Sequence, residues 1–311
     1  MITRRSAVFV AAAVAATACW GAGMTLTKLA LSYFEPSLLL VIQLLASIAF
    51  LALLLPVLRI PVPSWRLLFR VSGLGLLEPG LAYFLGLEGL QRISAAEAVV
   101  LSSTESILVI LLAWLLAIER PRGIVLVLAV VGAAGAILVA GSHLSQVGAA
   151  PSLWGDTLLL GGVLSAAAYV VWSSRLATLT EPLSTLIGQQ VVALLFALGV
   201  YLAIADNPAN VVSVTAYGWT LAAVSGIVQY ACAFWLYLWA LKGLRTGEAG
   251  LYLSLIPVFG LLIAIPTLGE RLSALQWMGA LLITGTIIVL AVVHDDHGGA
   301  DEPRRECAPT A

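Results

Sequence analysis

A glutamate, Glu78, lies about halfway along an apolar stretch that runs from residue 67 to residue 90. If this stretch crosses a lipid bilayer, an ionised carboxylate at that depth costs about 2.5–3.5 kcal/mol on insertion scales. Pro79 and Gly80 follow it, and a proline bends a helix and frees carbonyl groups that can line a binding site. We predict that Glu78 binds a solute or carries a coupling proton. The alternative is a protonated, hydrogen-bonded acid that only fixes helix packing.

A second acidic residue, Glu105, lies near the start of the next apolar stretch. Ser102, Glu105 and Ser106 follow one another at helical spacing and therefore share one helix face. With Ser103 beside them, they form a polar stripe that leads inward from the end of the helix. The alternative is a carboxylate at the helix end that is solvated or paired with Arg92.

An amide side chain, Gln229, lies halfway along a later apolar stretch, residues 216–241. Its amide offers both an acceptor and donors, so it can bind an amine or a carboxylate without titrating. The alternative is an interhelical hydrogen bond worth about 1 kcal/mol.

Aromatic residues are expected in any small-molecule site, because such pockets are mainly apolar with few polar groups. We favour Trp20, since Gly21 and Gly23 beside it allow close backbone approach. The other aromatic residues inside apolar stretches, each of which could instead serve packing alone, are Tyr83, Tyr169, Trp172, Tyr230, Trp235 and Tyr252. Tryptophans near the ends of stretches, expected to anchor to lipid headgroups, are Trp65, Trp154, Trp219 and Trp277.

The composition indicates where these residues act. Hydrophobic residues make up 61% of the 311 residues, and 15 basic and 16 acidic residues give a net charge of −1. The mean hydropathy is +1.05. A soluble domain is about one quarter charged, so we exclude a soluble enzyme and a disordered chain. Because the chain has no basic surplus, no nucleic-acid partner is expected.

Motifs for metal binding and catalysis are absent from the sequence. The 3 cysteines form no CxxC or Cys/His pattern, and His143, His294 and His297 lie at or beyond the ends of apolar stretches. No HExxH, P-loop or serine–histidine pair at depth occurs either. We predict no catalytic residue, no metal and no cofactor.

Charged and proline-rich breaks divide the chain into ten apolar stretches, each long enough for a membrane-spanning helix and too long for a barrel strand. These are residues 7–31, 36–58, 67–90, 96–118, 123–141, 154–179, 182–205, 216–241, 248–268 and 273–293. Arg4 and Arg5 imitate the start of a signal peptide, but the stretch continues to Leu31, so we predict an uncleaved first helix. The sequence predicts one all-α transmembrane domain over residues 1–311, ending in a polar cytoplasmic tail, 294–311.

The positions of the basic residues predict the orientation. With the N-terminus in the cytoplasm, only Lys28, Arg92 and Arg271 of the 15 basic residues fall on the outer side. One miscounted helix would exchange the sides of every later loop. We therefore predict a multi-pass membrane protein with both termini in the cytoplasm.

The two halves of the chain, residues 7–141 and 154–293, share a pattern. Residues that match in the same order are Glu35-Pro36 with Glu181-Pro182, Gln43 with Gln189, Glu78 with Gln229, Ser103 with Ser254, and Glu119-Arg120 with Glu270-Arg271. Because each half has five predicted helices, an odd number, the second half must be inverted in the membrane relative to the first. Inverted repeats are typical of secondary transporters, in which one site opens alternately to either side.

Segments near the C-terminal end and in the first stretch carry a resemblance to a known family. They are Pro257-Val258-Phe259-Gly260, Leu268-Gly269-Glu270-Arg271-Leu272-Ser273, Gln276-Trp277-Met278-Gly279-Ala280 and Trp20-Gly21. The pattern resembles the EamA-type drug/metabolite transporters over nearly the whole chain. Among them it looks most like bacterial amino-acid and metabolite exporters of the YddG type. The first half departs from the pattern, since Ser106 stands where the second half has Pro257.

This resemblance implies a secondary transporter, not an enzyme, that exports amino acids and related small metabolites by alternating access. The scarcity of charge at depth favours neutral, aromatic or zwitterionic solutes. The alternatives are another small solute such as a drug or a sugar-type metabolite, or an intramembrane enzyme. The expected partners are the solute and the bilayer, and the expected state is a monomer or a weak homodimer. Candidate substrate-binding residues are Trp20, Glu78 (also the coupling candidate), Tyr83, Ser103, Glu105, Tyr169, Gln229, Tyr252 and Ser254.

Overall fold

A computed structural model of the chain describes residues 4–59, 65–90, 92, 101–102, 104–120, 122–140, 152–179, 181–204, 214–268 and 274–297. Within these ranges every regular element is a helix, which confirms the prediction of an all-α protein. Ser103, Glu270 and Arg271 lie outside the described residues.

The helices of the first half are α1 (Arg4–Ala30), α2 (Pro36–Leu58), α3 (Trp65–Ser72), η1 (Gly73–Leu76), η2 (Leu77–Leu81), α4 (Ala82–Leu90), α6 (Glu105–Leu115) and α7 (Gly123–Ala140). Those of the second half are α8 (Leu153–Leu176), α9 (Pro182–Ile204), α10 (Ala216–Gly226), η5 (Ile227–Cys232), α11 (Ala233–Ala240), α12 (Thr246–Tyr252), η6 (Leu253–Leu255), α13 (Ile256–Leu268) and α14 (Ala274–His297).

Five described helical segments are long and apolar enough to cross a membrane: Ala7–Ala30, Pro36–Leu58, Leu153–Leu176, Pro182–Ala203 and Ala216–Ala240. Large apolar side chains cover their outer surfaces and those of their neighbours; Phe69, for example, is 79% exposed. Such a surface is expected against lipid and not against water. The chain is therefore a multi-pass membrane protein, whereas the count of ten spans, the inversion of the repeats and the side on which the termini lie stay predictions.

The ends of several helices follow from local sequence. Pro36 is the first residue of α2 and Pro182 the first of α9, positions where a missing N–H costs nothing. The Ser152 hydroxyl accepts a hydrogen bond from the Gly155 amide at 3.1 Å and caps α8. The two Glu-Pro turns are therefore helix starts.

Two helical segments are interrupted near their middle. The segment from α3 to α4 changes to a π turn at η2, where Glu78 leaves the helical conformation with φ −149° and ψ 131°. The segment from α10 to α11 contains a similar π turn, η5. The predicted mates Glu78 and Gln229 lie in these two π turns, but only Glu78 leaves the helical conformation, whereas η5 stays helical throughout.

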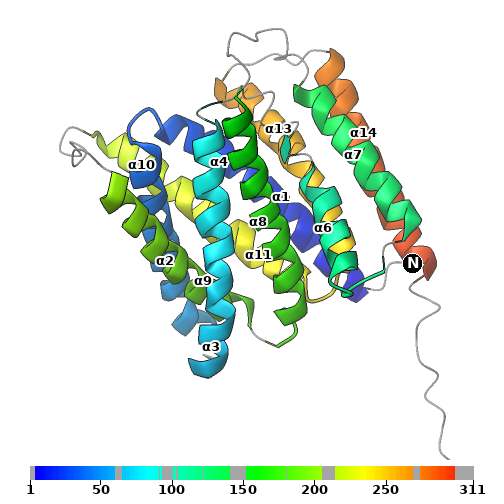
Figure 1. Cartoon of the computed structure of the whole chain (residues 1–311), viewed down its shortest axis with the longest axis horizontal. Coiled ribbons are helices and arrows are strands. Elements are labelled where there is room, and N and C mark those ends of the chain that lie inside the picture. Colours follow the sequence, from blue (N-terminus) through cyan, green and yellow to red (C-terminus); the bar gives the residue numbers. More distant parts are fainter. Residues whose placement is uncertain are drawn as a thin grey trace, which may run out of the picture.

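Contacts between helices recur when the two halves are exchanged. Helix α2 packs on α9, and α7 lies beside α14 at the opposite edge of the bundle (Figure 1). Helix α4 packs on α8 as α11 packs on α1, and η2 contacts α9 as η5 contacts α2. The interrupted segment of each half therefore lies against the first two helices of the other half.

Glycines bring the interrupted segments close to the other half. A Cβ atom on Gly75 would overlap the backbone of Gln189 in α9, and one on Gly226 would overlap the backbone of Gln43 in α2. Small residues permit such approach between membrane helices. The two glutamines at matching positions thus mark equivalent contacts.

We expect Gly75→Ala to destabilise the protein by about 1–3 kcal/mol, because the added methyl group must push α9 away. Gly199→Ala is the matched control, since no atom lies within 4 Å of a Cβ placed there. Thermal unfolding of the purified protein in detergent measures the difference. Equal stability of the two variants would contradict this close approach.

Candidate functional site

Glu78 is held by the interruption at η2. Its side chain is partly buried, and Pro79, which follows it, has no N–H to continue the helical ladder. The Ser165 hydroxyl of α8 donates a hydrogen bond of 2.9 Å to the carbonyl oxygen of Leu77, next to the break. The second half thus stabilises the backbone that presents Glu78.

Gln229 joins the interrupted segments of the two halves. Its Oε1 accepts a hydrogen bond of 2.7 Å from the Thr27 hydroxyl of α1, and its Nε2 lies 3.5 Å from the Tyr83 hydroxyl of α4. Gln43 Nε2 donates to Thr27 Oγ1 at 2.9 Å and to Ser225 Oγ at 2.8 Å. The predicted alternative for Gln229, an interhelical hydrogen bond, is thus present, and Nε2 stays only weakly engaged.

Gly23 allows the close backbone approach that the sequence suggested, and its neighbour is Gln229 of η5. A Cβ atom there would approach the side chain and backbone of Gln229, so this glycine lets α1 pack against η5. Gly21 likewise lies against the backbone of Ile256 and Gly260 in α13. Both glycines beside Trp20 therefore serve contacts between helices.

Aromatic rings from α1, α4, α8, η5 and α11 form a buried cluster beside these polar groups. Ring centroids of Tyr83 and Tyr230 lie 5.0 Å apart, and those of Trp20 and Phe234 lie 5.1 Å apart. Tyr237 packs edge-on against Trp20 at 5.2 Å. These separations are typical of favourable aromatic pairs. We call Trp20, Tyr83, Tyr169, Tyr230, Phe234 and Tyr237 the aromatic cluster.

Glu78 and Glu105 approach the same cluster. Each is partly buried, the two carboxyl groups interact electrostatically with each other, and both interact with Tyr83 and Tyr237. Arg92, the suggested partner of Glu105, instead pairs with Glu88 at 2.7 Å. The alternative that pairs Glu105 with Arg92 is therefore wrong.

The structure brings together Trp20, Glu78, Tyr83, Glu105, Tyr169 and Gln229 of the predicted residues. Tyr252 is buried in α12 and interacts with Glu248. The Ser254 hydroxyl lies 3.0 Å from that of Ser106, which also donates to the Gly250 carbonyl at 3.0 Å. These hydrogen bonds join η6 to α6.

Several residues of this region were not singled out from the sequence. Thr27 and Ser225 hold the two amides, and Gln190 Nε2 donates to the Tyr230 carbonyl at 2.6 Å. Ser47 Oγ donates to Gln190 Oε1 at 2.6 Å. The signal that could have identified them is a small polar residue or amide on the buried face of an apolar helix, since such groups need partners.

A network of ions lies at one end of the bundle. Arg245 Nε lies 2.8 Å from Glu119 Oε1, and the Gly247 amide donates to Glu119 Oε2 at 3.4 Å. Arg122 Nη1 lies 3.7 Å from Glu248 Oε1. These contacts join the turn between α6 and α7 to the start of α12. We call the end of the bundle that holds Arg122, Arg245 and their acidic partners Glu248 and Glu119 the basic end.

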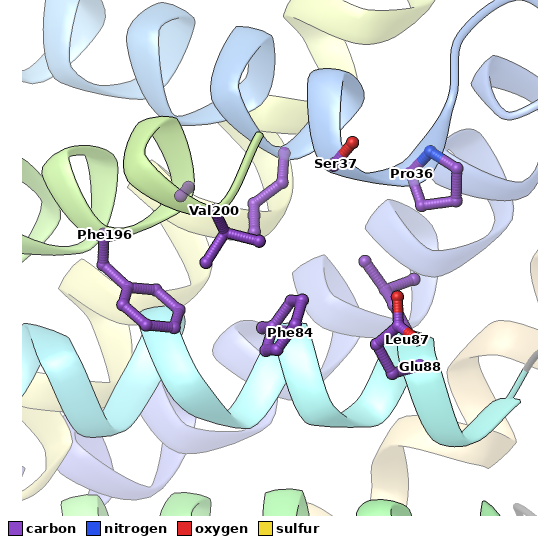
Figure 2. Close-up of a pocket in the computed structure, with 9 residues that line it drawn as sticks. Pro36, Ser37, Phe84, Leu87, Glu88, Phe196 and Val200 are labelled. Atoms are coloured by element: carbon purple, nitrogen blue, oxygen red, sulfur yellow. The ribbon is translucent and has the colours of Figure 1, made fainter. Parts of the chain in front are cut away.

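A groove opens between α2, α4 and α9 (Figure 2). Phe84 and Leu87 of α4 face Phe196 and Val200 of α9 across it. Its lining is apolar except for Ser37 and Glu88, and Glu88 is already paired. The groove therefore offers little chemistry compared with the centre of the bundle.

Comparison with known proteins identifies the chain. The model of the EamA-like transporter family matches it over residues 7–141 and again over residues 153–292. The chain belongs to the EamA-like transporter family. This confirms the resemblance predicted from the sequence, and it means that a small-molecule solute and the lipid bilayer are the partners of this transporter.

Two individual proteins are similar to this EamA-like transporter. The permease-like protein YdzE of Bacillus subtilis (strain 168) is 36% identical over 66 residues, which cover 21% of this chain and 85% of that protein. A solved crystal structure, titled only as a protein, superimposes with a TM-score of 0.78 at 20% identity. The match covers 94% of this chain and 99% of the solved one, and it shows a shared fold.

We expect Thr27→Val to destabilise the protein by about 1–3 kcal/mol, because Gln43 and Gln229 each lose a buried partner. Thr220→Val is the control, since its exposed hydroxyl bonds only to the Ala216 carbonyl of its own helix. Thermal unfolding in detergent compares the two. A Thr27→Val variant as stable as the control would show that the amide network contributes nothing.

Proposed function

We propose that this transporter exports amino acids and related small metabolites across the bacterial inner membrane by alternating access to one central site. The observation that carries the proposal is the meeting of Tyr83 and Gln229 from the two halves, 3.5 Å apart, beside Glu78. Discontinuous helices at mid-depth are typical of transporter binding sites.

The proposed mechanism needs two inverted halves that move against each other. Two separate matches to one family model and contacts that recur when the halves are exchanged support this arrangement. The start of α1 and the end of α14 lie at the same side of the bundle (Figure 1), which agrees with two cytoplasmic termini.

The central residues fit a solute that is partly apolar and partly polar. The aromatic cluster can cover an apolar body, the carboxylates can hold an ammonium group, and the weakly engaged Nε2 of Gln229 can donate to a carboxylate. An amino acid contains all three parts. Ser254 and Tyr252 lie outside this arrangement, and we propose them as parts of the moving contact between α6 and η6.

The basic end carries the proposed cytoplasmic gate. The charge distribution predicts that this end faces the cytoplasm, and here Glu119 and Arg245 hold it closed. Breaking this ion pair would separate the α6–α7 turn from α12 and admit solute from the cytoplasm. The opposite end then opens in the next step of the cycle.

Counterflow of labelled amino acids into liposomes that contain the purified protein tests the proposed function. We expect exchange of at least one amino acid and stimulation by a pH gradient if Glu78 carries a coupling proton. Glu78→Gln should lose the response to the gradient, whereas Glu88→Gln should behave like the unaltered protein. No flux of any amino acid would contradict the substrate class, and an unchanged gradient response in Glu78→Gln would contradict its coupling role.

We expect Glu119→Gln to open the basic end more often, because a neutral amide replaces the carboxylate that holds Arg245. A reporter cysteine at position 229, in a chain without other cysteines, should then react faster with an impermeant maleimide added from the basic side. Exchange of the two charges in Glu119→Arg with Arg245→Glu should restore slow labelling. Labelling rates equal in all three proteins would contradict the gate.

A further inference from the structure

A small cavity lies between α8, the first turns of α9, α11 and η1. Its wall is apolar except for Ser173, Thr185 and Gln189, each of which is at most 4% exposed. The cavity has room for about one water molecule. A space of this size can hold an ordered ligand only if polar groups in its wall need a partner.

Two hydroxyl groups in this wall have no hydrogen-bond partner in the part of the chain that the structure describes. They are Thr185 Oγ1 and Ser173 Oγ. Ser173 Oγ comes near the Tyr169 hydroxyl without the geometry of a hydrogen bond, and that hydroxyl donates to Gln189 Oε1 at 3.0 Å. A buried hydroxyl without a partner is unfavourable. Because both groups line one cavity, a single bound molecule can serve both.

The other half of the chain has an equivalent contact that is complete without a bound molecule. Thr27 matches Ser173 at the spacing that relates Gln43 to Gln189. The Thr27 hydroxyl accepts a hydrogen bond from Gln43 Nε2 at 2.9 Å and donates one to Gln229 Oε1 at 2.7 Å. Side chains alone therefore supply the partners in that contact.

One difference in sequence distinguishes the two contacts. Gln43 Nε2 also donates to Ser225 Oγ at 2.8 Å, whereas the residue that matches Ser225 is Leu74, in the wall of the cavity. Each of these two residues stands just before the glycine that approaches the other half. Leucine offers no hydrogen bond, and Gln189 Nε2 instead donates to the Val71 carbonyl at 3.3 Å. The second contact thus lacks the hydroxyl that completes the first.

We propose that this cavity binds one water molecule, which bridges the hydroxyls of Ser173 and Thr185. Hydration then completes the contact that the other half completes with side chains. Water fits because each hydroxyl can donate or accept a hydrogen bond, and water can do both. Among the described residues that line the cavity none is charged, so a neutral ligand is favoured over an ion.

Variants that remove one hydroxyl at a time test the bridge. If the hydroxyls lacked any partner, their removal would relieve an unfavourable buried group and stabilise the protein. If a water molecule joins them, Thr185→Val and Ser173→Ala should each lower the midpoint of thermal unfolding in detergent by about 2–4 °C. Thr220→Val, at an exposed hydroxyl bonded within its own helix, is the control. A rise of the midpoint in both cavity variants would overturn the proposal.

The double variant, Ser173→Ala with Thr185→Val, tests whether one molecule is shared. A bridging water is lost with either hydroxyl, so the double variant should lower the midpoint by less than the sum of the two single changes. Strictly additive changes would contradict a shared molecule.

Radiolytic footprinting of the unaltered protein, in water labelled with heavy oxygen, detects the water directly. Leu238 lines the cavity and is 4% exposed, whereas Leu44 is fully buried and does not line it. We expect X-ray exposure to label Leu238 several-fold more than Leu44, because radicals form where water is bound. Equal labelling of the two leucines would contradict the hydration site.

Exchange of K⁺ for Na⁺ tests the ion that could compete with water for the hydroxyls. We expect the midpoint of unfolding to stay the same in the two salts. Stabilisation by Na⁺ that disappears in Thr185→Val would show that a cation occupies the cavity, and it would overturn the proposal. None of these measurements involves transport, so their failure leaves the proposed function unaffected.

Discussion

In a lipid bilayer each backbone N–H and C=O group must find a partner inside the protein, and the centre of this transporter depends on how that requirement is met. The helix is interrupted at Glu78, and it widens to a π turn around Gln229. The Ser165 hydroxyl donates a hydrogen bond to the carbonyl of Leu77, and Gln190 Nε2 donates one to the carbonyl of Tyr230. Polar residues that look out of place in apolar helices are therefore partners of interrupted backbone. These partners stabilise the interrupted backbone, while Gln229 Oε1 is held by Thr27 and its Nε2 lies 3.5 Å from the Tyr83 hydroxyl.

The need of polar groups for partners inside a bilayer also explains how charge is distributed. Most charged groups lie at the ends of helices, where pairs such as Glu119 with Arg245 join the two halves, and exposed ion pairs of this kind are weak enough to break and re-form. The few acids at depth meet an aromatic cluster instead of a basic residue. A transporter needs ion pairs at its ends that can break, since a permanent contact there would not open. It also needs acids at depth without a basic partner, since a site that is already neutralised would not select a solute.

Much of the architecture was predictable because membrane helices follow simple rules of length and hydropathy. The apolar stretches, the Glu-Pro helix starts and the depth of Glu78 all follow from residue order. The electrostatic interaction between Glu78 and Glu105 was not predictable, because it depends on how distant helices pack. The neighbour of Gly23 was likewise not predictable. The sequence shows that residue 23 is small, but only the fold shows that it packs against Gln229. Ser254 was a candidate from its place in the repeat, but its hydrogen bond to Ser106 of α6 could not be predicted from the sequence.

The central claim is that the solute binds at the two interrupted segments. A cryo-EM structure of the protein in lipid nanodiscs, with a saturating concentration of an amino acid that it exchanges, tests it most directly. The account predicts density for the amino acid beside Glu78, Tyr83 and Gln229, with its side chain against Trp20. Density confined to the groove between α2, α4 and α9, with the centre empty, would contradict it.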